Sequence, residues 1–334
     1  MVITKTPFRI SFFGGGTDYP VWLDEYPGAV LSTTIDKYCY ITCRCLPAFF
    51  EHKYRIVYSL QERVNSVAEI DHPSVRACLQ FLRIREGMEI HHDGDLPART
   101  GIGSSSSFTV GMLNGLHAFR GRVVSKQRLV QDAIHVEQDL LKENVGCQDQ
   151  IAAAYGGFNL VSMTGARDFR VAPMTIRSDR LQTLQSHLML YYTGLSRTAS
   201  SIAHKQIRET RNKKAELRAM YDMVFEAVEI LNGSGSLAEF GKLLHRSWML
   251  KRTLTDQTSS PFIDGLYSTA RKAGAIGGKL LGAGGGGFFL LFAQPGRQAR
   301  IREKLKRLLH VPFRFEREGS QVIVYRPEEE IRPE

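Results

Sequence analysis

Apolar and polar residues alternate over several short stretches in the first half of the chain. The stretches with this period are residues 2–13, 29–45, 54–60 and 88–97. A period of two places one side-chain set on each face of an extended backbone, so each stretch predicts a β-strand. The first half is therefore expected to contain a sheet.

Helical spacing of apolar residues follows these strands. One helix is expected from Ser104 toward Arg120, and another after Ser125, a favoured N-cap residue. The second helix has apolar residues at Leu129, Val130, Ala133, Ile134, Leu140 and Leu141. A short third helix from Asp149 to Tyr155 should end at the glycine pair 156–157.

The second half carries longer, charged helical segments between apolar strand-like runs. Strands are expected at 188–194, 288–292, 311–315 and 321–325, and helices at 199–231, 237–253 and 297–309. The βα-ββ ending predicts a small α+β layer. We place a domain boundary within 160–180, giving an N-terminal domain of residues 1–170 and a C-terminal domain of residues 171–334.

Composition narrows the class of protein. The chain has 334 residues, of which 43% are hydrophobic and 23% charged, values typical of a folded protein with room for two domains. No apolar run approaches the ~18–20 residues of a membrane-spanning helix, and no signal peptide is recognised at the N-terminus. Five cysteines, an odd and sparse set, indicate reduced thiols and a cytoplasmic protein. The net charge of +10 indicates an anionic partner: nucleic acid, a membrane surface or a phosphorylated small molecule.

Three glycine-rich loops are the main candidates for ligand contact, at residues 14–16, 101–104 and 282–287. Glycine lets a ligand approach the backbone closely, although each loop alone is also consistent with a simple turn. In 101–107 two glycines lead into four serines at a predicted helix start, where free amides favour an anion such as phosphate. Serine hydroxyls there could also ligate Mg²⁺, and the alternative is an ordinary helix cap. The chain has no Walker A sequence.

The loop 282–287 matches the pattern G-x-G-x-x-G of dinucleotide-binding proteins. That pattern requires a strand before the loop and a helix after it. We expect a helix before this loop and the strand 288–292 after it. The sequence therefore favours a tight loop packed against a ligand or another backbone.

Four charged residues are candidates for chemistry near these loops. Glu137 and Asp149 lie on successive predicted helices, where one could ligate a metal and the other could act as a base. Arg9 and Asp18 flank the first glycine loop, where they could face a phosphoryl group and polyol hydroxyls. Each also has an ordinary alternative: an exposed helix carboxylate, an N-cap, a solvent-facing strand residue or a turn aspartate.

Three motifs together resemble the GHMP kinases, a family of small-molecule kinases. They are the segments 6–20, TPFRISFFGGGTDYP, 96–107, LPARTGIGSSSS, and 279–288, KLLGAGGGGF. The resemblance spans nearly the whole chain. It implies a two-domain α+β fold, with an N-terminal domain like domain 2 of ribosomal protein S5, a ferredoxin-like C-terminal α/β layer, and the active site in the cleft between them.

The resemblance also implies roles for individual residues, with ATP and Mg²⁺ as cofactors. Asp149 matches the catalytic aspartate and Arg9 the basic residue near the phosphoryl-transfer centre. ATP binding is implied for Pro97, Gly101, Ile102, Gly103, Ser104, Ser105 and Ser106. Mg²⁺ would be held by Ser105 and Glu137, with Ser104 the adjacent alternative. Substrate binding is implied for Gly15, Gly16, Thr17, Asp18, Gly284 and Gly285.

The first motif bears on the acceptor. Galactokinases carry Gly-Glu-His-Thr-Asp where this chain has Gly14–Asp18, so two side chains are missing from the sugar pocket. The form found here resembles the branch that phosphorylates D-glycero-D-manno-heptose 7-phosphate at O1, for nucleotide-activated heptose of surface polysaccharide. The alternatives are a fucokinase or another sugar-1-kinase and, in a different class, a non-catalytic nucleic-acid-binding protein using the basic stretch 204–218. The expected partners are ATP and a sugar phosphate, without nucleic acid or membrane; a homodimer is left open.

Overall fold

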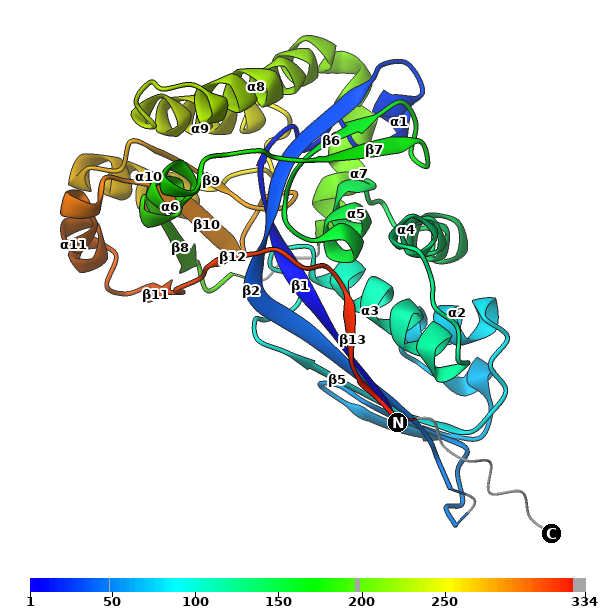
Figure 1. Cartoon of the computed structure of the whole chain (residues 1–334). Helices are drawn as coiled ribbons and strands as arrows, with labels where there is room; N and C mark the ends of the chain where they lie inside the picture. Colours follow the sequence, from blue (N-terminus) through cyan, green and yellow to red (C-terminus); the bar gives the residue numbers. More distant parts are fainter. Residues whose placement is uncertain (48, 196–198, 327–334) are drawn as a thin grey trace.

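Two long antiparallel strands, β1 (Val2–Phe13) and β2 (Gly28–Cys45), run through the middle of the molecule (Figure 1). The structure is a computed structural model and describes residues 1–47, 49–195 and 199–326. The first residues of β1 alternate between buried and half-buried, as the sequence pattern predicts. From Thr6 to Phe13 every residue is buried, because helices cover β1 on both faces there.

The larger sheet has nine strands within the described ranges, and its main order is β13-β1-β2-β5-β3-β4. Strand β12 pairs with β2, as does β6, which in turn pairs with β7. The further strands are β3 (Tyr54–Val57), β4 (Gln61–Val64), β5 (Met88–Gly94), β6 (Phe158–Met163), β7 (Phe169–Pro173), β12 (Phe315–Glu316) and β13 (Gln321–Tyr325).

A smaller sheet belongs to the second half of the chain. In the part of the chain that the structure describes it has four strands, in the order β11-β8-β10-β9. These are β8 (Leu188–Tyr192), β9 (Gly277–Leu280), β10 (Phe288–Phe292) and β11 (Leu309–His310). All of β10 is buried, which explains its uninterrupted apolar sequence.

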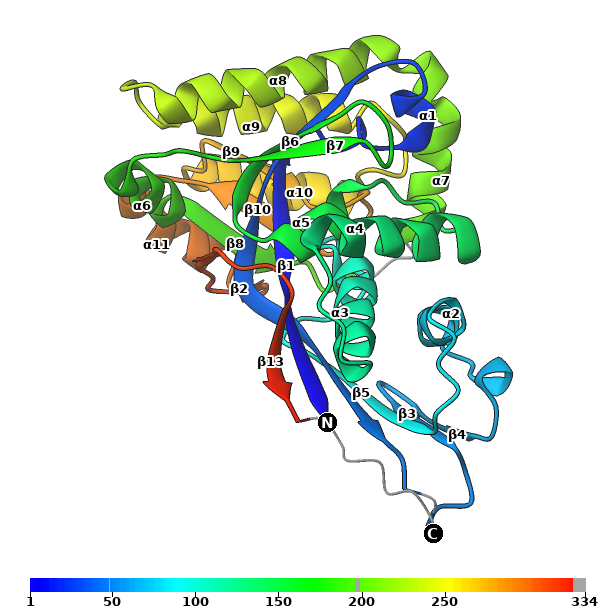
Figure 2. The same ribbon diagram turned by 45° about the vertical axis from the view of Figure 1, so that its right-hand side comes forward.

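The helices cover both sheets. They are α1 (Pro20–Leu23), α2 (Pro73–Phe81), α3 (Ser104–Phe119), α4 (Lys126–Ile134), α5 (Gln148–Tyr155), α6 (Ser178–Ser186), α7 (Ala199–Glu209), α8 (Lys214–Asn232), α9 (Ala238–Lys251), α10 (Pro261–Ala273) and α11 (Pro295–Lys304). Helices α3 and α5 pack against β1 and β2. Helix α8 also contacts both strands and α9 contacts β1; Figure 2 shows these two helices at the top of the molecule. One buried apolar cluster includes residues of both sheets.

Most predicted elements are confirmed within a few residues. Ser125 caps α4 as predicted, since its Oγ accepts the amide of Arg128 at 3.2 Å. The expected helix 199–231 is instead α7 and α8, separated by a 3₁₀ turn at Thr210–Asn212. The expected strand 54–60 is half of a hairpin, and the expected strand 311–315 is only β12 at its end. The strand β9, not a helix, directly precedes the loop 282–287; because β10 follows it, the dinucleotide pattern remains excluded.

The C-terminal strands do not stay with the second half. Strand β13 pairs with β1, where Val2 lies opposite Tyr325, and β12 pairs with β2. Residues far apart in sequence thus complete the first sheet, and residue 170 lies within β7. The α+β fold class is confirmed, while the division into domains at residue 170 stays a prediction. Helices long and apolar enough to cross a bilayer are absent from the described residues.

Candidate active site

The serine-rich loop forms the start of α3. Gly103 is the N-cap, with φ of 74°, and the amide of Ser107 makes the first intrahelical bond, to the Gly103 carbonyl at 2.9 Å. The amides of Ser104, Ser105 and Ser106 precede that bond and so are available to a ligand. The positive end of the helix dipole favours an anion at this position.

Two glycines of this loop permit close approaches that a Cβ would block. A Cβ on Gly103 would lie 3.2 Å from Arg9 Cγ and 3.4 Å from an oxygen of Asp149. A Cβ on Gly101, where φ is +80°, would lie 2.5 Å from the carbonyl oxygen of Leu281. The first glycine brings an ion pair against the helix start, and the second brings the loop 282–287 against the serine-rich loop.

Arg9 and Asp149 form a bidentate ion pair beside that helix start. Arg9 Nε donates to Asp149 Oδ1 at 2.7 Å, and Nη2 donates to Oδ2 at 2.9 Å. Arg9 Nη1 donates to the carbonyl of Gly101 at 2.5 Å. Strand β1 supplies the arginine, which is 4% exposed, and the first turn of α5 supplies the aspartate. The fixed fork of the guanidinium holds the carboxylate in one orientation.

Asp18 lies in the turn after β1 and is almost fully buried. One of its oxygens accepts the amide of Gly16 at 2.9 Å, and the other accepts the amide of Gln148 at 3.5 Å. Burial raises the pKa of Asp18, opposed by the Gly16 amide and reinforced by the charge of Asp149. Asp18 and Asp149 therefore lie near one another although 131 positions separate them in sequence.

Glu137 lies on a π-helical turn, His135–Leu140, that continues α4. Its Oε2 accepts Ser106 Oγ at 2.9 Å and also the amide of Gln150. Burial raises the pKa of Glu137 to about 7, with the charge of Glu143 adding to the shift. Its Oε1 is buried without a hydrogen-bond partner in the described part of the chain.

These contacts fit a Mg²⁺ ligand set of carboxylate and hydroxyl oxygens, the donors that this ion prefers. An orphaned, buried carboxylate oxygen is satisfied when a cation binds to it. The serine that contacts Glu137 is Ser106, while Ser105, which the resemblance assigns to Mg²⁺, is exposed. The role of Ser105 as a ligand stays a prediction. The first turn of α3 points Ser106 inward and Ser105 outward, since successive helical residues lie about 100° apart.

A cavity of about 280 Å³ lies between the glycine loops and α5. Ten of the predicted site residues line it: Arg9, Gly15, Gly16, Asp18, Gly101, Gly103, Ser104, Ser105, Ser106 and Asp149. The structure thus brings together residues of the first two motifs and Asp149, whereas Glu137, Gly284 and Gly285 do not line the cavity.

Other predicted site residues lie outside the cavity wall. Ile102 is part of the apolar core, and Thr17 Oγ1 donates to the carbonyls of Gly14 and Ala29, so it shapes the first loop. A Cβ on Gly284 would lie 2.7 Å from the Thr258 carbonyl oxygen, which also accepts the Gly285 amide. Pro97 is exposed and accepts the hydroxyl of Thr100. The loop 282–287 instead reaches the cavity through Gly282 and Ala283.

Sequence reasoning missed two buried lysines in this wall, Lys251 and Lys279. Lys251 is the last residue of α9, and Lys279 lies on β9. Burial lowers the pKa of Lys251 to about 7, and the charge of Arg9 adds to the shift. Lys279 belongs to the third motif, so the sequence offered a reason to consider it. Nothing in the sequence distinguishes Lys251 from an ordinary lysine at the end of a helix.

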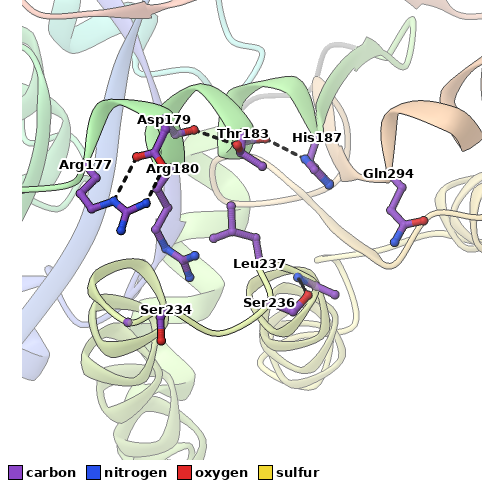
Figure 3. Close-up of a pocket in the computed structure, with 11 residues that line it drawn as sticks. Arg177, Asp179, Arg180, Thr183, His187, Ser234, Ser236, Leu237 and Gln294 are labelled. Atoms are coloured by element: carbon purple, nitrogen blue, oxygen red, sulfur yellow. Dashed lines mark hydrogen bonds and ion pairs between the residues drawn. The ribbon is translucent and has the colours of Figure 1, made fainter.

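A second cavity, of about 300 Å³, lies between α6, the turn from α8 to α9, and Gln294 (Figure 3). It shares no residue with the first cavity. Its arginines already have partners: Arg177 pairs with Asp179, and Arg180 donates to the carbonyls of Ile230 and Leu231 at the end of α8. This cavity therefore carries no candidate chemistry.

Comparisons with known proteins agree with the motifs. Residues 70–157 match the model of the GHMP kinase N-terminal domain, and residues 209–311 match that of the GHMP kinase C-terminal domain. These ranges contain the serine-rich loop, Glu137, Asp149 and Lys251, and each half of the chain has its own match.

Individual relatives point the same way. A D-glycero-alpha-D-manno-heptose 7-phosphate kinase from Campylobacter jejuni is 27% identical over 316 residues, covering 91% of this chain and 93% of that protein. An L-fucokinase/L-fucose-1-P guanylyltransferase from Bacteroides fragilis is 29% identical over 233 residues, covering 66% of this chain and 24% of that protein. A crystal structure described as a D-glycero-D-manno-heptose 1-phosphate kinase from Bacteroides thetaiotaomicron superposes with a TM-score of 0.73, at 24% identity, covering 96% of this chain and 98% of that one.

Proposed function

The chain belongs to the GHMP kinase family and is a phosphotransferase with a hydroxyl acceptor; from this premise we propose that it phosphorylates D-glycero-D-manno-heptose 7-phosphate at O1. The donor is the γ-phosphoryl group of ATP, and the product is the 1,7-bisphosphate. Such a product would feed the synthesis of nucleotide-activated heptose for surface polysaccharide. The full-length similarity to a heptose 7-phosphate kinase supports this acceptor.

The observation that carries the proposal is the Arg9–Asp149 pair at the start of α3. A carboxylate has about four lone-pair sites, and Arg9 occupies two of those on Asp149. The remaining ones are free to accept the O1 hydroxyl, because the side chain of Asp149 is 25% exposed and lines the cavity.

In the proposed reaction Asp149 orients the O1 hydroxyl and takes its proton. The bond from O1 to the γ-phosphorus forms while the bond from that phosphorus to the bridging oxygen of ADP breaks. The amides of Ser104–Ser106 hold phosphate oxygens, and Arg9 neutralises charge that develops on the transferred group. Phosphoryl transfer depends mainly on such positioning and charge neutralisation.

Mg²⁺ would be held by Glu137 together with the hydroxyl of Ser106 or of its neighbour Ser105. When bound it would neutralise charge on the triphosphate. The protein itself fixes the carboxylate for this role, since Ser106 and Gln150 both donate to Oε2 and leave Oε1 without a partner in the described residues.

The sugar hydroxyls would meet the wall beside the first glycine loop. Ser11 Oγ and Gln148 Oε1 are both buried, and neither has a hydrogen-bond partner among the described residues. Both residues line the cavity together with Asp18 and Gly15. A polyol ligand would supply the missing hydrogen bonds, which an apolar ligand would not.

A fucokinase remains the alternative, supported by the similarity to the Bacteroides fragilis protein. The names of the heptose kinases also differ in the phosphate that their acceptor carries, at position 7 in one and at position 1 in the other. The acceptor must therefore be tested directly.

Release of ADP should be measured in a coupled assay with Mg-ATP and five acceptors. These are heptose 7-phosphate, sedoheptulose 7-phosphate, fucose, galactose and mevalonate. We expect the highest kcat/KM with heptose 7-phosphate. A higher kcat/KM with fucose would favour the fucokinase alternative over the heptose 7-phosphate kinase. Salt-sensitive DNA binding without any ADP release would refute the kinase proposal.

A further inference from the structure

Lys251 turns its side chain away from solvent although it ends a helix. Lysines in the last turn of a helix commonly reach into water, where they still interact with the helix dipole. Here the residue is 6% exposed and lines the cavity of the proposed active site. Its Nζ donates to the carbonyl of Leu280 at 3.3 Å and to the carbonyl of Gly282.

The ammonium group has more donors than these contacts use. It carries three hydrogens, and the two carbonyls account for two of them. Neither Lys251 nor Lys279 forms an ion pair with a carboxylate in the described part of the chain. In its charged form Lys251 thus has one donor left at the cavity without an acceptor among the described residues.

The charged groups around Lys251 do not neutralise its positive charge. Four ionisable groups lie around it: Arg9 and Asp18 beside the first loop, Lys279 on β9, and Asp149 beyond Arg9. Asp149 already pairs with Arg9, and the two oxygens of Asp18 already accept the amides of Gly16 and Gln148. A buried cation without a counter-ion is costly, and a bound anion removes that cost.

Lys279 lies behind this position. It is 2% exposed, and its Nζ donates to the carbonyl of Phe12 at 2.8 Å, which ties β9 to the end of β1. Lys251 meanwhile holds the loop 282–287 by its first carbonyl, and Gly101 brings the same loop against the phosphate-binding helix start. The free donor of Lys251 is thereby fixed close to the place where phosphoryl groups would bind.

We propose that Lys251 is a binding residue for a phosphoryl group held in this cavity. The proposal rests on the proposed kinase function, which supplies two sources of that group: the γ-phosphoryl of ATP and the phosphate of the acceptor. Both present anionic oxygens to the ammonium, so the chemistry of recognition is the same. Binding also recruits a proton to Lys251 when the free residue is neutral.

The test is isothermal titration calorimetry of the full chain, with Lys251→Met as the variant. Methionine keeps most of the length and removes the charge. Lys242→Met is the matched control, since Lys242 lies on the same helix but is exposed and pairs with Glu239. Ligands are the β,γ-imido analogue of ATP, ADP, heptose 7-phosphate and the free heptose, all with excess Mg²⁺.

We expect Lys251→Met to weaken one phosphorylated ligand by about 10- to 100-fold and to leave its partner lacking that group unchanged. If affinity falls for the ATP analogue but not for ADP, the group that Lys251 binds is the γ-phosphoryl. If affinity falls for heptose 7-phosphate but not for heptose, the group is the phosphate of the acceptor. Equal affinities of Lys251→Met and Lys242→Met for every ligand would overturn the proposal. The comparison of the ATP analogue with ADP gives a result even if heptose 7-phosphate is not the acceptor.

A second measurement needs only a comparison with the wild type. Titrations at pH 8 in two buffers of different ionisation enthalpy count the protons taken up on binding. Because burial lowers the pKa of Lys251 to about 7, the free residue is mostly neutral at pH 8. Uptake approaching one proton in the wild type, lost in Lys251→Met, is expected; the same uptake in both would contradict the proposal. If Lys251→Met does not fold, Lys251→Gln takes its place in the titrations, and unchanged affinity for every ligand in that variant would overturn the proposal.

Discussion

At the scale of single residues, the site depends on a few fixed polar contacts. Arg9, Asp149 and Gly101 form one unit: two hydrogen bonds orient the carboxylate and a third ties the guanidinium to the loop. Because Gly103 lacks a Cβ, this unit lies directly against the start of α3. The proposed chemistry follows from that contact between an ion pair and free amides.

Asp149→Asn should keep the fold and lose turnover. The amide removes the proton acceptor, so we expect kcat to fall by about 10²–10⁴-fold. The thermal midpoint should also fall, because the amide nitrogen cannot accept the second hydrogen bond from Arg9. Asp179→Asn is the matched control, since Asp179 is exposed, pairs with Arg177 and does not line the active-site cavity. Near-normal turnover of Asp149→Asn would remove this residue from the role of base.

Gly15→Ala should affect the acceptor without affecting stability. A Cβ there would lie 3.6 Å from Gln148 Nε2 and 3.8 Å from Ser11 Oγ, ordinary contacts that strain nothing. It would, however, fill space beside the polar groups proposed to bind sugar hydroxyls. We expect a raised KM for the acceptor, an unchanged KM for ATP and an unchanged thermal midpoint. Gly265→Ala on α10, with open space around its Cβ, is the control; equal acceptor KM values in both variants would contradict the substrate role.

The sequence singles out several residues that the structure places around one cavity. Arg9 and Asp18 flank the first glycine-rich loop and Asp149 lies at the start of a predicted short helix, and all three line the cavity. Their roles stay predictions. Lys251 was missed, because its burial depends on how α9 meets β9, and nothing within α9 itself signals that packing. That Ser106 rather than Ser105 contacts Glu137 reflects the direction of the first helical turn, which consecutive serines do not reveal.

At the scale of elements, local signals predicted the helices and strands better than their pairing. The cap at Ser125 and the alternation in β1 are local properties, and both are confirmed. The return of β13 to β1 is not local: the apolar run 321–325 predicts a strand but does not say which sheet it joins. Strands β6, β7 and β9 and helices α2 and α6 were not predicted.

The π-helical turn His135–Leu140 buries Glu137 completely, and the stability of the protein therefore depends on pH. Because burial raises its pKa from 4.5 to about 7, the folded state binds the proton more tightly than the unfolded state. Stability from this group is present below pH 4.5 and is lost as the pH rises to about 7.

Glu137→Gln should therefore raise the free energy of unfolding at pH 8, by about 1–3 kcal/mol, and change it little at pH 4.5. Mg²⁺ should stabilise the wild type with bound ADP at pH 8 but not this variant. Denaturant unfolding at both pH values, with and without Mg²⁺, measures both effects. Equal stabilisation of wild type and variant by Mg²⁺ would contradict Glu137 as a metal ligand.

At the scale of the whole molecule, the two sheets meet at the site through backbone contacts. A Cβ added to Gly282 would lie only 2.4 Å from the Cα of Gly101. Lys279 Nζ on β9 donates to the carbonyl of Phe12 on β1. A shared apolar cluster continues this contact into the core. The site is thus formed by both halves of the chain, as the family resemblance implied.

Gly101→Ala should damage this junction. The new methyl would meet the Leu281 carbonyl at 2.5 Å in a left-handed backbone, so we expect destabilisation of about 1–3 kcal/mol and weaker nucleotide binding. Gly296→Ala, with nothing near its Cβ, serves as the control in denaturant unfolding and ATP titration. Wild-type stability and affinity in Gly101→Ala would show that the two loops need not touch.

The central claim, transfer of phosphate to O1 of heptose 7-phosphate, is tested most directly by ³¹P NMR of the product formed with Mg-ATP. The account predicts a bisphosphate, in which the new phosphorus signal couples to the anomeric proton and the original 7-phosphate signal persists. A new phosphate on a primary hydroxyl, or no phosphorylated sugar under conditions where another acceptor is turned over, would contradict it.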